Sequence, residues 1–320
     1  MSEEIPQLCA DALGLDKSAV ARVLSLFEDQ RPEAIDARIA ISAELIPHRA
    51  RRATVLGLTG TPGSGKSSLL ARLAPMLIAG DPKFSVAVLA VDPSSQISGG
   101  ALLGDRTRMR APPGEKRLFF RSQASATALG GLGPSTFQAC RALSWLFDCV
   151  LIETVGVGQA ESDIRHLADR VYLVLQPLAG DEVQFLKAGI LEVPHAFVLN
   201  KCDEPSAQRS AQALRATIGL ARPDAPEGIP TFETSARTGA GLPSLLTEFQ
   251  HAIARGPVLD DRTRDAHFFN AWVQDEWGRR GVAALQAAGG AGPLLSRGFD
   301  QAQREFDRAK GEPQQQNQKL

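Results

Sequence analysis

The sequence predicts an α/β fold, a mainly parallel β-sheet with helices on both faces. Short apolar or β-branched runs alternate with amphipathic stretches of helical length across residues 53–256, a pattern typical of such sheets. Polar motifs follow several of these runs, and sheets of this class bind ligands beyond the carboxyl ends of their strands. The expected strands are Thr54–Leu58, Val86–Val91, Val150–Ile152, Val171–Leu175, Phe197–Leu199 and Ile229–Phe232, and the expected helices lie near residues 66–79, 134–147, 181–191 and 206–218.

Helical extensions flank this α/β domain on both sides. Residues 1–52 carry apolar side chains at helical spacing, so we expect an N-terminal helical extension there. Residues 257–320 predict a C-terminal arm whose first helix breaks near 288–293, whose second runs from about Ser296 to Lys310, and whose tail is disordered. The first helix of the arm carries an apolar stripe of Phe268, Phe269, Trp272, Trp277 and Leu285. That stripe either packs on its own chain or forms a dimer contact, and we expect a homodimer.

The bulk composition excludes several classes of protein. The 320 residues include 35 basic and 36 acidic side chains, with a net charge of -1, so nothing indicates a nucleic-acid or membrane partner. No apolar run reaches the roughly 18 residues of a transmembrane helix. The first residues are acidic and do not resemble a signal peptide, so we expect a cytoplasmic protein, or a matrix protein if it is imported. The four cysteines form no C-x-x-C pair, which predicts a reduced chain without disulfides.

A glycine-rich loop follows the first expected strand and leads into a helix. It matches the pattern G-x-x-x-x-G-K-S in its strand–loop–helix setting, which predicts a P-loop NTPase. The glycines let backbone N–H groups turn toward phosphate oxygens, and the helix offers its positive end to the same anion. Lys66 can reach the outer phosphates, and the Ser67 hydroxyl can bind Mg²⁺. The predicted phosphate-binding residues are Gly60, Thr61, Pro62, Gly63, Ser64, Gly65, Lys66, Ser67 and Ser68.

An N-K-x-D tetrapeptide, Asn200 to Asp203, follows a later strand and predicts specificity for guanine. The Asp203 carboxylate can accept hydrogen bonds from the ring N–H and the exocyclic amine of guanine, whereas adenine presents the wrong pattern. A buried acceptor without a partner costs about 1–3 kcal/mol. Lys201 can lay its stem over the base, and Asn200 can tie this loop to the phosphate loop. Ser235 and Ala236, in a Thr-Ser-Ala motif after the last strand, are expected to contact guanine through their backbone.

Four further segments carry a family resemblance. They are Val91-Asp92-Pro93-Ser94-Ser95, Gly104-Asp105-Arg106-Thr107-Arg108-Met109, Glu153-Thr154-Val155-Gly156-Val157-Gly158-Gln159 and the stretch 180–189. Together with the loops above, they resemble the MeaB/ArgK-type GTPases, which are G-protein chaperones associated with methylmalonyl-CoA mutase. The resemblance covers about residues 54–255. It implies that residues 92–109, 153–165 and 177–189 are switch segments.

Carboxylates in these segments are candidates for catalysis and metal binding. Glu153 ends a buried strand, where it can orient a water or help to hold Mg²⁺ through a water. Asp92 and Asp105 can join Mg²⁺ when phosphates are present. We therefore predict Lys66, Glu153 and Asp92 as catalytic residues, and Ser67, Asp92, Asp105 and Glu153 as the metal site. Arg106, Arg108 and Arg110 either supply charge to the transition state or face solvent, and Asp181 and Glu182 either belong to a switch or favour a helix start.

The sequence thus predicts a GTPase that binds GTP, GDP and Mg²⁺ and hydrolyses GTP as a timing switch for a partner protein. The resemblance implies that this partner is an adenosylcobalamin-dependent acyl-CoA mutase, with roles in cofactor loading and protection. Residues 96–98 and the C-terminal arm depart from the relatives, which leaves the client and the dimer geometry open.

Two alternatives remain. One is a metal-delivery GTPase, although the five histidines are scattered. The other is a kinase, which needs an acceptor site beside the γ-phosphate.

Overall fold

The computed structural model contains two compact units, each described separately. The α/β unit comprises residues 51–132 and 143–258, and the helical unit comprises residues 1–50, 133–142 and 259–320. The helix α5 (Pro134–Leu146) contributes its residues up to Ala142 to the helical unit and its last turn to the α/β unit. The structure describes residues 4–92, 114–124, 132–154, 163–177, 192–221 and 228–310.

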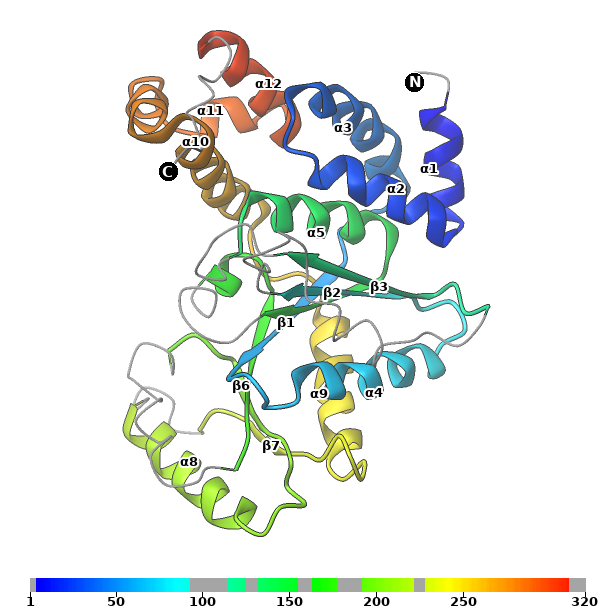
Figure 1. Ribbon diagram of the computed structural model, residues 1–320, viewed down its shortest axis with the longest axis vertical. Coiled ribbons are helices and arrows are strands. Elements are labelled where there is room, and N and C mark those ends of the chain that lie inside the picture. The colour runs from blue at the N-terminus through cyan, green and yellow to red at the C-terminus, as the bar shows by residue number, and fades with distance from the viewer. Residues whose placement is uncertain are drawn as a thin grey trace, which may run out of the picture. The chain divides into compact units, whose positions relative to one another are not determined.

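Within the described residues, the α/β unit contains one seven-stranded sheet with the order β3-β2-β4-β1-β5-β6-β7 (Figure 1). Every neighbouring pair is parallel, so the predicted parallel sheet is confirmed. The strands are β1 (Thr54–Gly60), β2 (Val86–Asp92), β3 (Leu118–Ala124), β4 (Cys149–Thr154), β5 (Arg170–Leu175), β6 (Ala196–Leu199) and β7 (Thr231–Glu233).

Helices cover both faces of this sheet, because alternate residues of the same strand point to opposite sides. Tyr172 and Val174 of β5 join an apolar cluster with α4 (Lys66–Ala79) and α9 (Leu242–Arg255). The alternate residues Leu173 and Leu175 pack instead with α8 (Ala207–Ala221). Burial on both faces explains why the central strands are continuous apolar runs.

Two elements of the α/β unit were not predicted. The strand β3 lies at the edge of the sheet, and its short apolar run Leu118–Phe120 is followed by the half-buried polar residues Arg121 and Ser122. The helix α9 begins directly after Gly241, whose φ of 70° lies in the left-handed region, and no helix was expected there. The expected helix near 181–191 lies outside the described residues.

The described part of the helical unit is built from helices near both ends of the chain. Its elements are α1 (Ile5–Leu13), α2 (Lys17–Glu28), α3 (Pro32–Leu45), the short η1 (Ile46–His48), α10 (Asp261–Ala287), α11 (Gly292–Leu295) and α12 (Phe299–Lys310). The helices expected in both extensions are therefore present. The helix α10 is interrupted at Gly278, whose φ of 57° and ψ of -155° are not helical. The predicted tail, 311–320, lies outside the described residues.

Aromatic side chains form much of the core of the helical unit. Phe137 stacks on Phe268 with ring centroids 4.5 Å apart, and Phe299 packs against Phe137 at 4.9 Å. Phe269 contacts Trp272 at 5.3 Å. Part of the predicted apolar stripe of the arm thus contributes to the core of its own unit.

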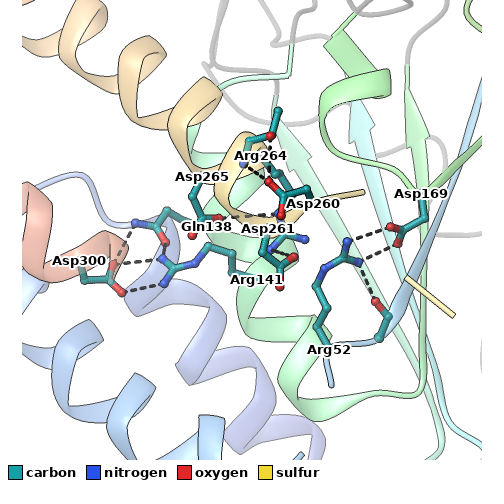
Figure 2. Close-up of polar contacts among 11 residues, drawn as sticks. Arg52, Gln138, Arg141, Asp169, Asp260, Asp261, Arg264, Asp265 and Asp300 are labelled. Carbon is teal, nitrogen blue, oxygen red and sulfur yellow. Dashed lines mark hydrogen bonds and ion pairs between the residues drawn. The ribbon is translucent and has the colours of Figure 1, made fainter. Parts of the chain in front are cut away.

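A buried polar network surrounds the carboxylate of Asp300, and Figure 2 shows its members Gln138, Arg141 and Asp300. The guanidinium carbon of Arg141 lies 5.6 Å from the ring centroid of Phe137. The carboxylate of Asp300 accepts hydrogen bonds from the guanidinium groups of Arg38 at 3.2 Å and Arg141 at 3.1 Å. Gln138 and Ser42 also donate to it, at 3.0 and 3.2 Å. Because every partner is buried, this network is a fixed part of the helical unit.

A second buried ion pair fixes the start of the sheet in the α/β unit. Arg52 donates two hydrogen bonds to the carboxylate of Asp169, at 2.7 and 2.8 Å (Figure 2). The same carboxylate accepts from the backbone N–H groups of Val55 at 2.8 Å and Val258 at 2.9 Å. Asp169 therefore joins the segment before β5 to the beginning of β1 and to the segment after α9.

No helix in the described part of the chain is long and apolar enough to cross a membrane.

Candidate functional site

The phosphate loop lies between β1 and α4, at the carboxyl end of the central strand. Gly60 ends β1 with a φ of 142°, and a Cβ there would lie 1.9 Å from the carbonyl oxygen of Val174. Gly63 and Gly65 have φ values of 77° and 88°, which only glycine adopts readily. The loop conformation therefore depends on its glycines. The helix α4 begins at Lys66, as predicted, with no acidic residue in its first turn, so its N-terminus can accept an anion.

Lys66 is held inside this loop. Its ammonium group donates to the carbonyl oxygens of Gly60 at 2.8 Å and Thr61 at 3.1 Å, and the residue is only 7% exposed. The Ser64 hydroxyl is buried and has no hydrogen-bond partner among the described residues. Both groups can turn to phosphate oxygens, which fits a nucleotide di- or triphosphate.

Glu153 meets the phosphate loop from the neighbouring strand. Its carboxylate accepts a 2.6 Å hydrogen bond from the hydroxyl of Ser67, and Glu153 is buried near the end of β4. These oxygens are of the kind that Mg²⁺ prefers. Asp92 is the last residue of β2, but its side chain and all of Asp105 lie outside the described residues. The described residues contain no group of three or more His, Cys, Asp or Glu side chains that could hold a metal.

Asn200 joins the phosphate loop to the base-recognition loops. Its amide donates to the carbonyl oxygen of Ser64 at 2.8 Å, and its oxygen accepts from the backbone N–H of Ala236 at 3.1 Å. Asn200 is 1% exposed. A Cβ on Gly65 would lie 2.4 Å from the Asn200 amide nitrogen, so the two loops approach as closely as glycine allows.

A pocket of about 500 Å³ opens beside these loops. Lys201 has a φ of 61°, and its ammonium group donates to the side-chain oxygen of Gln176 at 2.6 Å. Arg72 donates to the carbonyl oxygen of Ala236 at 3.3 Å. The residues that line the pocket are Gly65, Ser68, Asn200, Lys201, Asp203, Glu204, Ser235, Ala236 and Arg237.

The Asp203 carboxylate faces this pocket and already has two side-chain partners. It accepts hydrogen bonds from the Ser235 hydroxyl and from the Arg237 guanidinium. These two hydrogen bonds, in that order, lower the pKa of Asp203 below its ordinary value. Because guanine is a hydrogen-bond donor at this edge, an ionised carboxylate is the form that suits it.

The structure thus brings together the predicted residues of the phosphate loop, Glu153, and the predicted residues of the N-K-x-D and Thr-Ser-Ala motifs. The sequence did not predict three residues of this site, Gln176, Arg72 and Arg237. Arg237 could have been noticed, because it directly follows the Thr-Ser-Ala motif, whereas nothing in the sequence marks the other two.

A glycine-formed phosphate cradle with a lysine, linked by Asn200 to a pocket with an N-K-x-D motif, defines a P-loop GTPase on a parallel sheet. The chain belongs to the MeaB family, because the family model described as "Methylmalonyl Co-A mutase-associated GTPase MeaB" matches residues 20–282. This confirms the resemblance that the sequence motifs carry, and with it the binding of guanine nucleotides.

Three comparisons illustrate the relationship. A "Putative GTPase" of Caulobacter vibrioides is 39% identical over 85% of this chain and 86% of its own length. The "Methylmalonic aciduria type A homolog, mitochondrial" of Mus musculus is 35% identical over 68% of this chain and 54% of its own length. A solved structure, "Crystal structure of LAO/AO transport system kinase", has a TM-score of 0.59 and 21% identity, covering 96% of this chain and 98% of that chain. This last likeness concerns the fold alone.

Proposed function

We propose that this GTPase is a timing switch for an adenosylcobalamin-dependent acyl-CoA mutase, with roles in loading the cofactor and protecting the mutase. The observation that carries the switch is the hydrogen bond from Asn200 to the Ser64 carbonyl oxygen, 2.8 Å long. Through it, base recognition and phosphate binding share one continuous site. The family description and the name of the mouse relative support the mutase as the client.

The residues of the phosphate loop position and neutralise the triphosphate. Lys66 leaves the carbonyl oxygens of Gly60 and Thr61 and turns to the outer phosphates, while backbone N–H groups of the loop hold the others. Ser67, Glu153, Asp92 and Asp105 would hold Mg²⁺, which supplies charge neutralisation for the phosphate oxygens when bound. Glu153 is buried beside Ser67 and can also orient the attacking water.

The base pocket discriminates between nucleotides. Asp203 accepts from the ring N–H and the exocyclic amine of guanine, Ser235 and Ala236 contact the base through their backbone, and Lys201 covers its face. An adenine nucleotide would leave acceptors without donors, which costs about 1–3 kcal/mol for each group.

The client is tested with the purified mutase. Candidate mutases are mixed with this protein in the presence of GDP or a non-hydrolysable GTP analogue, and complex formation and cofactor loading are measured. We expect a complex whose stability differs between the two nucleotides, and loading that depends on GTP. The Lys66→Ala variant is the control, since it should lose the nucleotide dependence. Loading that proceeds identically with and without this protein and GTP would remove the mutase as client.

The reaction itself is tested with GTP labelled at the γ-phosphate. We expect all of the label to be released as free phosphate, because the proposed reaction transfers the group to water. Label on a protein or on a small-molecule acceptor would contradict hydrolysis and favour a kinase.

The remaining proposals concern assembly and location. We propose a homodimer in the cytoplasm. Sedimentation of the pure protein across a range of concentrations measures its mass, and a monomer at all concentrations would contradict the dimer.

A further inference from the structure

Both oxygens of the carboxylate proposed to recognise guanine have side-chain partners within the chain. One oxygen of Asp203 accepts from the Ser235 hydroxyl, and the other accepts from the guanidinium of Arg237. Guanine offers two donors, so it needs both oxygens, and Arg237 lines the pocket that the base would fill. The arginine and the base therefore compete for the same carboxylate.

The two partners of Asp203 differ in how firmly they are held. Ser235 is fully buried, and its hydroxyl also accepts from the backbone N–H of Thr238 at 3.1 Å. By contrast, the side chain of Arg237 is 77% exposed. An exposed ion pair contributes little stability, so a ligand can displace Arg237 far more easily than it can displace Ser235.

We propose that Arg237 is a specificity-determining residue that competes with guanine for Asp203 and slows nucleotide association. This inference rests on the proposed base pocket and adds a regulated step to it. Once the base is bound, Arg237 has left the carboxylate, so its removal leaves the dissociation rate unchanged. Inosine has the ring N–H but no exocyclic amine, so it needs only one carboxylate oxygen and competes less with Arg237.

The test measures association and dissociation of ribose-labelled fluorescent GDP and IDP by stopped flow. For the Arg237→Ala variant, we expect association of GDP to rise roughly two- to five-fold, the range that an exposed ion pair accounts for. We expect a smaller gain for IDP and an unchanged dissociation rate.

The matched control is Arg215→Ala. Arg215 is also an exposed arginine of the α/β unit and pairs with Glu233 at 2.5 Å, so this variant makes the same change in net charge. We expect it to leave both nucleotides unaffected, or to slow both equally through lost long-range attraction to the phosphates.

The outcomes separate this inference from the proposed function. Slower or unchanged GDP association in Arg237→Ala, relative to the control, would overturn the competition, as would an equal gain for GDP and IDP. If the unaltered protein instead shows no preference for GDP over ADP, the base pocket itself is wrong.

Discussion

Two carboxylates with arginine partners, Asp300 in the helical unit and Asp203 in the α/β unit, show two different uses of an ion pair. Asp300 in the helical unit is 3% exposed, and its arginines Arg38 and Arg141 are 3% and 7% exposed. The arginine partner of Asp203 is 77% exposed. A buried pair cannot exchange its partners without leaving a charge uncompensated, whereas an exposed pair can. The first arrangement stabilises a fold, and the second leaves a carboxylate available to a ligand.

The pKa values of Asp300 and Asp203 are both lowered, but for different reasons. Burial raises the pKa of Asp300, but Arg141 and Arg38 more than offset this, so its pKa is lower than usual. The pKa of Asp203 is also lowered, here by hydrogen bonds from Ser235 and Arg237. The same direction of shift thus accompanies a structural role in one unit and a proposed binding role in the other.

Removing the buried carboxylate should give the largest effect. Asp300→Ala leaves Arg38 and Arg141 buried without an anion, so we expect the free energy of unfolding to fall by about 3–5 kcal/mol. Urea unfolding measures this through tryptophan fluorescence, because Trp272 and Trp277 lie in the helical unit. Asp36→Ala is the control, since it breaks only the pair with Arg304, in which Asp36 is 67% exposed, and should cost about 0–1 kcal/mol. Similar losses for both variants would mean that the buried network is not fixed.

Changing the lysine of the phosphate loop should act on the reaction and not on the fold. Lys66→Ala removes the cation proposed to neutralise the outer phosphates, so we expect kcat for GTP hydrolysis to fall on the order of 100- to 1000-fold. Phosphate release measures the rate, and circular dichroism checks that the variant is folded. A folded variant that keeps its full rate would remove Lys66 from the proposed mechanism.

A substitution where the phosphate loop meets Asn200 should have a smaller effect, on nucleotide affinity. A side chain at Gly65 would meet the Asn200 amide nitrogen at 2.4 Å, while Gly63 has nothing within 4 Å. Both have positive φ, which costs a non-glycine residue about 1–2 kcal/mol. We therefore expect Gly65→Ala to lower GDP affinity by roughly ten-fold or more, and by more than Gly63→Ala. Titration calorimetry of both variants measures the difference, and equal losses would mean that the Asn200 contact does not matter.

The smallest expected effect is a change in the stability contributed by Asp300 as the pH falls. Because the folded-state pKa of Asp300 is lowered, its contribution to stability is complete above its unfolded pKa of about 3.9. That contribution is lost as pH falls through the folded pKa. The stability difference between the unaltered protein and Asp300→Ala should thus shrink below about pH 4. Urea unfolding at several pH values measures it, and a difference that grows on acidification would contradict the assigned shift.

The sequence allowed the phosphate loop, the base-recognition motif and most of the strands to be predicted, because these depend on local patterns. Gly60, Gly65 and Lys66 are fixed by short-range geometry that a motif encodes. The contacts of Asp300 with Arg38 and Arg141 could not be predicted from the sequence, because the three residues come from distant segments. The edge strand β3 was missed because its outer residues need not be apolar.

Most residues of the predicted switch segments lie outside the described part of the chain. Asp105 and residues 155–162 and 178–191 lie outside the described ranges, so their roles stay predictions. Glu153 was predicted from its place at the end of a strand, and its hydrogen bond to Ser67, 2.6 Å long, could not be known without the register between β1 and β4.

The central claim is that Asp203 recognises guanine through its two carboxylate oxygens. The most direct test is calorimetric titration of the unaltered protein and Asp203→Asn with GDP, ADP and xanthosine diphosphate. Xanthine has a carbonyl where guanine has its exocyclic amine, so the introduced amide offers it one acceptor and one donor. We predict that the unaltered protein prefers GDP, and that Asp203→Asn loses GDP binding and gains xanthosine diphosphate binding. Equal binding of GDP and ADP by the unaltered protein, or full GDP affinity in Asp203→Asn, would contradict the account.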